Sequence, residues 1–325
     1  MKAITQSKAR SYWQAVVGVL LGISLAGCNQ VDSNRISGGI DDKAQVVATS
    51  TIIADLAEEI GGEEIQLTGI LEPGVDPHIY EPTPADSRVL ETADLILYNG
   101  YNLEPGLINL MNAAGEKARK VAVGEVVKPL QLDGYEGKVV PDPHVWGNVE
   151  NAIAMTNIIR DELIKLSPTD EAEFTQRASE LTQELQQLHN WINQQIQTIP
   201  ADKRQLVTTH DAFQYYGNAY GLAIAGTLIG ISTEEQPSAQ TVTRLVESIK
   251  TNNVPAIFAE TTINPALIKT VAQEAGVKLA PRELYADSIG EKGSEGDSYI
   301  KMMAANTRTI VEALGGKYTP FQPTN

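Results

Sequence analysis

Three of the four histidines in this chain lie where predicted β-strands pass into loops. His78 lies in VDPHIYEPTP, His144 in PDPHVWGNVENA, and His210 ends the strand-like run RQLVTTH, with 66 residues between successive members. Asp287 ends another strand-like run, VKLAPRELYAD. Imidazole nitrogens bind Zn(II), Mn(II) and neighbouring ions, and a carboxylate adds charge and a hard oxygen. The pattern therefore predicts a transition-metal site made of His78, His144, His210 and Asp287.

Acidic residues accompany these histidines. Asp76 and Asp142 each lie two positions before one of them, Asp211 directly follows His210, and Glu260 ends the strand-like run PAIFAE. Carboxylates often accept a hydrogen bond from the second ring nitrogen of a metal-binding histidine. Turn formation and solvation are the other roles open to Asp76, Asp142 and Asp211.

The elements that must position these residues are arranged around one long predicted helix, residues 170–199. Its apolar residues recur every three or four positions, which places them on one side of a helix: Phe174, Ala178, Leu181, Leu185, Leu188, Ile192, Ile196 and Ile199. Pro200 ends the pattern, so the helix should span roughly 43 Å. His189 lies one position off the stripe, and we expect it to be a solvated helix residue rather than a ligand.

Strand-like and helix-like segments alternate on both sides of this helix. Strands separated by helices of about ten residues favour an α/β fold with parallel sheets covered on both faces. We therefore predict an N-terminal lobe (residues 45–169) and a C-terminal lobe (residues 200–325), each with a core of its own, joined by the helix at 170–199. Ligands of such sheets bind at the carboxyl ends of the strands, where the histidines are expected.

The chain begins with an export signal, predicted as residues 1–28. A basic start precedes about 12 apolar residues, which are too few to cross a bilayer core of ~30 Å. The signal ends in Leu25-Ala26-Gly27-Cys28, which resembles the lipobox of bacterial lipoproteins and predicts acylation of Cys28, the sole cysteine. Residues 29–44 are polar, lack periodicity and predict a flexible tether.

The charge balance separates this protein from nucleic-acid binders. The full chain has 25 basic and 41 acidic residues, and with three of the basic residues in the signal the remainder carries a net charge of −19. A surface this acidic repels nucleic acid and attracts cations.

Four segments together give a resemblance to a known family. The two Asp-Pro-His segments, THDAFQYYGNAYGL and ELYADSIGEKGSEGDSYIKMMAANTRTIVEAL resemble, in this order, the metal-binding receptor lipoproteins (substrate-binding proteins) of bacterial ABC importers for manganese and zinc. The resemblance extends from about residue 46 to 314. It implies a monomer that is not an enzyme, anchored at the outer face of the cytoplasmic membrane, which clamps one divalent ion between two lobes and delivers it to a permease with an ATPase subunit.

The resemblance leaves the ion open between manganese and zinc. Zinc-dedicated members usually carry a histidine-rich loop between the first two ligands, whereas the corresponding DGYEGKVVPD is short and lacks histidine. Manganese-dedicated members often have glutamate where this chain has His210. Three nitrogens and one oxygen suit tetrahedral Zn(II), and a bidentate Asp287 would give Mn(II) a fifth ligand atom. We rank manganese slightly ahead as the transported ion and expect zinc to bind at least as tightly in vitro.

Three other functions compete with this prediction. One is a zinc-specific uptake receptor, and another is a surface adhesin on the same scaffold. The third is a zinc hydrolase, in which three histidines leave the fourth position to water. Asp287 would fill that position, and the chain has no HExxH motif, so the hydrolase is disfavoured.

Overall fold

The computed structural model describes residues 43–133 and 139–323. The predicted signal, Cys28 and the tether up to residue 42 lie outside the described residues, and the first strand already begins at Ala44, the last residue predicted for the tether. Within the described ranges no helix is long and apolar enough to cross a membrane.

The first half contains a four-stranded parallel sheet in the order β2-β1-β3-β4. Its strands are β1 (Ala44–Ala48), β2 (Ile65–Gly69), β3 (Leu95–Tyr98) and β4 (Arg119–Ala122). The helices of this half are α1 (Thr51–Gly61), α2 (Pro84–Thr92), α3 (Pro105–Ala114) and α4 (Val149–Leu166).

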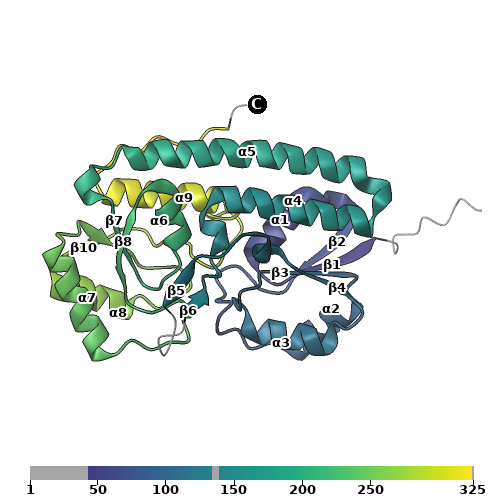
Figure 1. Cartoon of the computed structure of the whole chain (residues 1–325), viewed down its shortest axis with the longest axis horizontal. Helices are drawn as coiled ribbons and strands as arrows, with labels where there is room; N and C mark the ends of the chain where they lie inside the picture. The colour runs from purple at the N-terminus through teal and green to yellow at the C-terminus, as the bar shows by residue number, and fades with distance from the viewer. Residues whose placement is uncertain (1–42, 134–138, 324–325) are drawn as a thin grey trace, which may run out of the picture. The chain divides into compact units, whose positions relative to one another are not determined.

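Alternating residues of the central strand β1 are buried on opposite faces of this sheet. Val46 and Ala48 belong to a core shared with α1 and α4, whereas Val47 belongs to a core shared with α2 and α3. Figure 1 shows the two pairs of helices on opposite sides of the sheet. The predicted parallel sheet with two covered faces is thereby confirmed for this half.

The second half repeats the strand pattern on a smaller scale. Two parallel pairs, β7-β8 and β9-β10, are joined where the N–H of Phe258 donates to the carbonyl of Val207 at 2.9 Å. The strands are β7 (Gln205–Thr208), β8 (Ala223–Thr227), β9 (Ala256–Ile257) and β10 (Lys278–Leu279). The helices are α6 (Gln214–Tyr220), α7 (Ala239–Thr251), α8 (Ala266–Ala275) and α9 (Tyr299–Ala313). The resulting order, β8-β7-β9-β10, matches that of the first half.

Some elements were not predicted from the sequence. Helix α4 and the antiparallel pair β5 (Gln131–Asp133) and β6 (Val139–Pro141) lie in a segment for which no element was expected. The sequence predicts a helix near residues 87–92 after a Pro-rich connection, EPTPAD. Helix α2 begins earlier, at Pro84, because Thr83 caps it and Asp86 completes a capping box, so part of the connection is helical.

The long helix is α5 (Glu171–Gln197), a 27-residue helix within the predicted 170–199. All eight residues of the predicted apolar stripe are buried. In Figure 1 α5 runs along one side of the molecule, beside α1 and α4 of the first half and α9 of the second, and it contacts all three. Helix α5 is therefore packed against both halves along its length.

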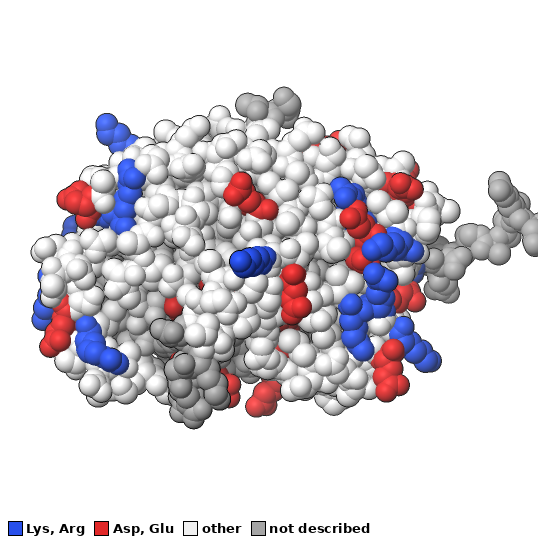
Figure 2. Space-filling model, in the orientation of Figure 1, with Lys and Arg blue, Asp and Glu red and all other residues white. Residues whose placement is uncertain are grey.

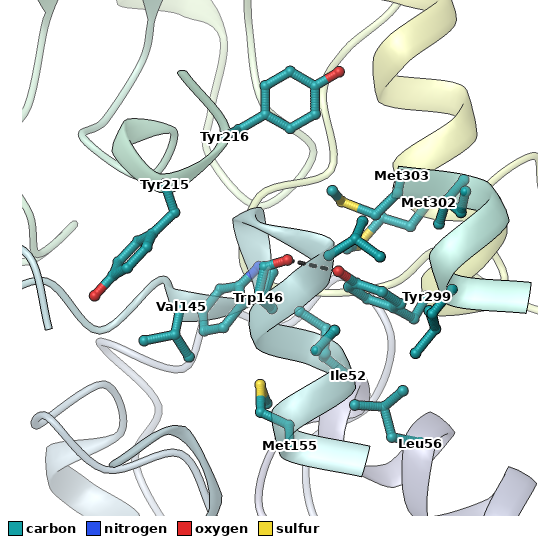
Figure 3. Packing of buried hydrophobic residues seen from close by; sticks show 14 of the residues in the cluster. Ile52, Leu56, Val145, Trp146, Met155, Tyr215, Tyr216, Tyr299, Met302 and Met303 are labelled. Carbon is teal, nitrogen blue, oxygen red and sulfur yellow. Dashed lines mark hydrogen bonds between the residues drawn. The ribbon is translucent and has the colours of Figure 1, made fainter. Parts of the chain in front are cut away.

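Besides the smaller core that each lobe has of its own, the two lobes share a larger core beneath α5. One continuous cluster includes Ile52 and Leu56 of α1, Met155 of α4, and Met302 and Met303 of α9. These residues surround Trp146 and Tyr299, whose hydroxyl donates to the Trp146 carbonyl at 2.7 Å (Figure 3). Smaller clusters lie on the far face of each sheet, so the halves are separate there and joined under α5.

Candidate metal centre

The four predicted ligands all follow strands. His78 lies in the loop after β2, His144 follows β6, His210 follows β7, and Asp287 lies between β10 and α9. The carboxyl ends of parallel strands meet at one edge of a sheet, which brings the loops of His78, His210 and Asp287 together between the two halves. His144 instead follows a strand of the antiparallel pair β5-β6.

The structure brings all four side chains into one buried cluster. Their exposed fractions are 5% for His78, 0% for His144 and His210, and 1% for Asp287. One potential ligand atom from each residue lies within 4.8 Å of the others. Nε2 of His78 is 3.2 Å from Nε2 of His144, and the Asp287 carboxylate lies 3.4 Å from Nε2 of His144 and 3.1 Å from Nε2 of His210.

Several of these atoms lack hydrogen bonds. Nε2 of His210 and both carboxylate oxygens of Asp287 have no hydrogen-bond partner among the described residues, although His210 and Asp287 are close. Buried polar atoms are rarely left unpaired. Three imidazole nitrogens and a carboxylate that converge in this way fit a divalent transition metal, which would bind to the unpaired atoms.

His144 is oriented by the aspartate two residues before it. Oδ1 of Asp142 lies 2.7 Å from Nδ1 of His144 and also accepts from its backbone N–H at 3.0 Å. Asp142 is fully buried. This carboxylate fixes the ring so that Nε2 points toward the cluster, as expected of a partner to a metal-binding histidine.

His210 is oriented by Glu260 and not by its neighbour Asp211. Nδ1 of His210 contacts Oε2 of Glu260, whose Oε1 accepts from the backbone N–H groups of Thr209 and His210 at 2.7 and 2.9 Å. The Asp211 carboxylate instead accepts from the side chain of Gln214. The interpretation of Glu260 as a hydrogen-bond partner is confirmed. Asp211 instead takes the local role that the sequence also left open, because its side chain contacts Gln214 at the start of α6.

His78 has a different kind of support. Its backbone N–H donates to Oδ1 of Asp76 at 2.9 Å, while Oδ2 of the same carboxylate accepts from the hydroxyl of Thr233 at 2.6 Å. Asp76 therefore holds the main chain at His78 and not its imidazole.

The electrostatics of the cluster differ from ligand to ligand. Burial lowers the pKa of His78 to about 3, so its ring is neutral at pH 7. Burial also acts to lower the pKa of His210, but the carboxylates of Glu260 and Asp287 raise that pKa well above its ordinary value. Burial opposes ionisation of Asp287, yet the imidazoles of His210, His144 and His78 lower the pKa of this carboxyl. A metal ion that binds to Nε2 of His210 must therefore compete with a proton at that atom.

His189 lies outside the cluster, on α5. It is half-buried, and its Nδ1 lies 3.3 Å from the hydroxyl of Tyr220. The expectation that it is not among the clustered ligands agrees with this position, but it is not simply solvated, because it packs on the Tyr220 ring.

A groove of about 550 Å³ opens onto the cluster at His78. Its other walls come from Tyr101, Glu125, Pro141 and Glu235, among others. On the face drawn in Figure 2, acidic and basic side chains are interspersed and no continuous basic surface is visible. The groove therefore adjoins the ligand cluster on the side of His78.

The sequence of this chain is similar to those of known metal-uptake proteins. The family described as zinc-uptake complex component A, periplasmic, matches residues 46–313. The manganese ABC transporter substrate-binding lipoprotein PsaA of Streptococcus pneumoniae is 36% identical over 301 residues, which cover 91% of this chain and 96% of PsaA. The manganese-binding lipoprotein MntA of Bacillus subtilis is 35% identical over 296 residues, covering 90% of this chain and 95% of MntA.

A solved structure gives the same result for the fold. The periplasmic zinc-binding protein TroA from Treponema pallidum matches with a TM-score of 0.79 and 35% identity, over 84% of this chain and 99% of TroA. The predicted two-lobed α/β architecture is confirmed by this match.

Proposed function

This chain belongs to the family of periplasmic zinc-uptake component A proteins, and from that premise we propose that it captures a divalent transition-metal ion outside the cytoplasmic membrane and delivers it to the permease of an ABC importer. The ion is the transported substrate. The observation that carries the proposal is the convergence of His78, His144, His210 and Asp287, with unpaired donor atoms on His210 and Asp287.

We rank manganese slightly ahead of zinc as the transported ion. PsaA and MntA are both named for manganese, and each resembles this chain over nine-tenths of its length or more. TroA is named for zinc, and three imidazole nitrogens with one carboxylate suit tetrahedral Zn(II). We therefore expect the purified protein to bind both ions, with zinc at least as tight as manganese.

The anchor and the partners follow from the same family membership. Acylation of Cys28 would hold the protein at the outer face of the membrane, and the tether would let the metal-binding part reach the permease, which works with an ATPase subunit. We propose that the protein acts there as a monomer. The relatives PsaA and MntA are both named as lipoproteins, which supports the proposed lipid anchor at Cys28.

We propose transport and not catalysis. A zinc hydrolase with three histidine ligands keeps its fourth coordination position for water. Here the Asp287 carboxylate lies 3.1 Å from His210 and 3.4 Å from His144, where it would take that position.

The test is elemental analysis of protein purified from its own cell envelope, combined with a competition titration of Mn(II) against Zn(II). Stoichiometric manganese or zinc supports the proposed function, and manganese in the native protein supports our ranking. The proposed function would be contradicted if the purified protein contains neither ion and binds neither ion in the titration.

A further inference from the structure

His78 is the least constrained of the four clustered side chains. Carboxylates orient the rings of His144 and His210 through Nδ1, whereas Nδ1 of His78 has no hydrogen-bond partner among the described residues. His78 is also the only one of the four that lines the groove. An ion that enters or leaves through the groove therefore meets His78 first.

The loop that carries His78 is held from the other half of the molecule at two points. The Thr233 hydroxyl, between β8 and α7, donates to Oδ2 of Asp76 at 2.6 Å. The backbone N–H of Gly74 donates to the hydroxyl of Ser288 at 2.8 Å. Gly74 has φ +81°, a conformation that favours glycine, so the sequence of this loop suits the geometry that presents the N–H to Ser288.

Both contacts adjoin the ligand cluster; the one between Thr233 and Asp76 is buried at both ends, whereas in the other Ser288 is buried and Gly74 is exposed. The exposed fractions are 7% for Asp76, 9% for Thr233 and 1% for Ser288. Ser288 directly follows Asp287, and Asp76 holds the backbone N–H of His78. Each contact thus links a residue of the second half to the main chain of the His78 loop. A hydrogen bond is lost when its atoms move apart by about 1 Å, so separation of the halves would free this loop.

We propose that Thr233 and Ser288 are positioning residues that form a two-point latch on the His78 loop, and that this latch sets the rate at which the bound ion is released. Neither hydroxyl belongs to the ligand cluster. They act through His78, because Thr233 holds the carboxylate of Asp76, which in turn holds the backbone N–H of His78, and Ser288 holds Gly74 of the same loop. The proposal rests on the proposed function, since it presumes that the cluster binds an ion.

The experiment compares release rates of Mn(II) and Zn(II) after rapid mixing with excess chelator. Thr233→Val and Ser288→Ala each remove one hydroxyl with little change in shape and should accelerate release by about tenfold, as other outer partners of ligands do. Thr233→Ser keeps the hydroxyl and should restore the parental rate. Thr156→Val is the matched control, because its fully buried hydroxyl bonds only within α4, to the Ala152 carbonyl at 2.8 Å.

A double-mutant cycle distinguishes a positioning role of Thr233, exerted through His78, from a general structural defect caused by the substitution. If the latch acts through His78, adding Thr233→Val to His78→Ala should produce no further acceleration, whereas a general structural defect would add its effect in both backgrounds. Parental release rates in both latch variants, or full additivity with His78→Ala, would overturn the latch. Failure of the parent protein to bind either ion would instead overturn the proposed function and the latch with it.

Discussion

The carboxylate of Asp55, on α1, accepts a hydrogen bond of 2.8 Å from the backbone N–H of Tyr299, the first residue of α9. The first N–H groups of a helix have no partner within it, and a negative charge at this end is favourable. The Asp55 side chain of α1, in the first half, therefore caps the N-terminus of α9, in the second half, beside the shared core shown in Figure 3.

The burial of this carboxyl predicts a pH-dependent stability. Burial raises the pKa of Asp55 to about 6; the hydrogen bond from Tyr299 acts to lower this pKa, and Glu59, Glu58 and Asp297 add smaller contributions that raise it. Because this pKa is higher in the folded than in the unfolded chain, the stabilisation from the bound proton is full below about pH 4 and is lost as the pH rises through 6.

Asp55→Asn should remove that pH dependence, since the amide oxygen can still accept from Tyr299. Between pH 4 and pH 7.5 the free energy of unfolding of the parent should fall relative to the variant by on the order of 2 kcal/mol. Urea titrations across this range with chelator present measure the difference. A difference that stays constant with pH would contradict the prediction.

A second prediction concerns Glu260→Gln. Glu260 orients His210 and raises the pKa of its ring, which favours a proton on the ring that a metal ion must displace. The variant should bind metal about 10- to 100-fold more weakly and release fewer protons on binding. Calorimetry in two buffers of different ionisation enthalpy measures both quantities.

Glu247→Gln, at an exposed position on α7, is the control for loss of one negative charge. It should match the parent in affinity and in proton release. Equal proton release by Glu260→Gln and the parent would show that Glu260 does not govern the protonation of His210.

Ion selectivity is predicted to depend on His210. In His210→Glu a hard oxygen replaces a borderline nitrogen, and Zn(II) loses more than Mn(II) from this exchange. The ratio of zinc to manganese affinity should fall by on the order of tenfold, equivalent to ~1.4 kcal/mol. Because the new carboxylate would lie against Glu260, both affinities should fall, so the ratio is the quantity to measure by competition titration.

Two further variants check this assignment. His210→Ala should weaken both ions, and His189→Ala, on α5 beside Tyr220, should weaken neither. If His210→Ala binds both ions as the parent does, His210 is not a ligand and the proposed four-residue site is wrong.

Metal should also stabilise the fold. The clustered ligands come from both halves, so the ion should bind the folded chain and not the unfolded one. At ~100 times its dissociation constant it should add roughly 2.7 kcal/mol to the free energy of unfolding. Thermal denaturation with saturating metal and with chelator tests this, and identical melting curves would count against coupling of the halves by the ion.

The last prediction concerns the anchor. Cys28→Ser removes the only thiol and the expected acylation site, so the protein should appear in a soluble exported fraction with its metal binding intact. Fractionation after a high-salt wash, with immunodetection, measures the distribution. Retention of the variant on the membrane would contradict the lipid anchor.

The sequence alone was sufficient for features that depend on local periodicity or on a residue's place after a strand. The stripe from Phe174 to Ile199 identified α5, and all eight of its members are buried, because a three-to-four residue spacing leaves an isolated helix only one apolar side to bury. Likewise, the positions of His78, His210 and Asp287 after strand-like runs predicted that they lie at the carboxyl edges of parallel sheets, where the structure clusters them. His144 joins them from the antiparallel pair β5-β6, which the sequence did not predict.

Tertiary structure decided what depends on contacts between distant segments. Asp211 and Glu260 were both candidate partners in the sequence, and Glu260 takes that role because β9 packs beside β7 and the chain after β9 brings Glu260 next to the His210 main chain. The shared core beneath α5 and the contacts of Thr233 and Ser288 with the His78 loop join residues more than 150 positions apart. Such contacts depend on how the two sheets and α5 are oriented, and no local pattern of residues encodes that orientation.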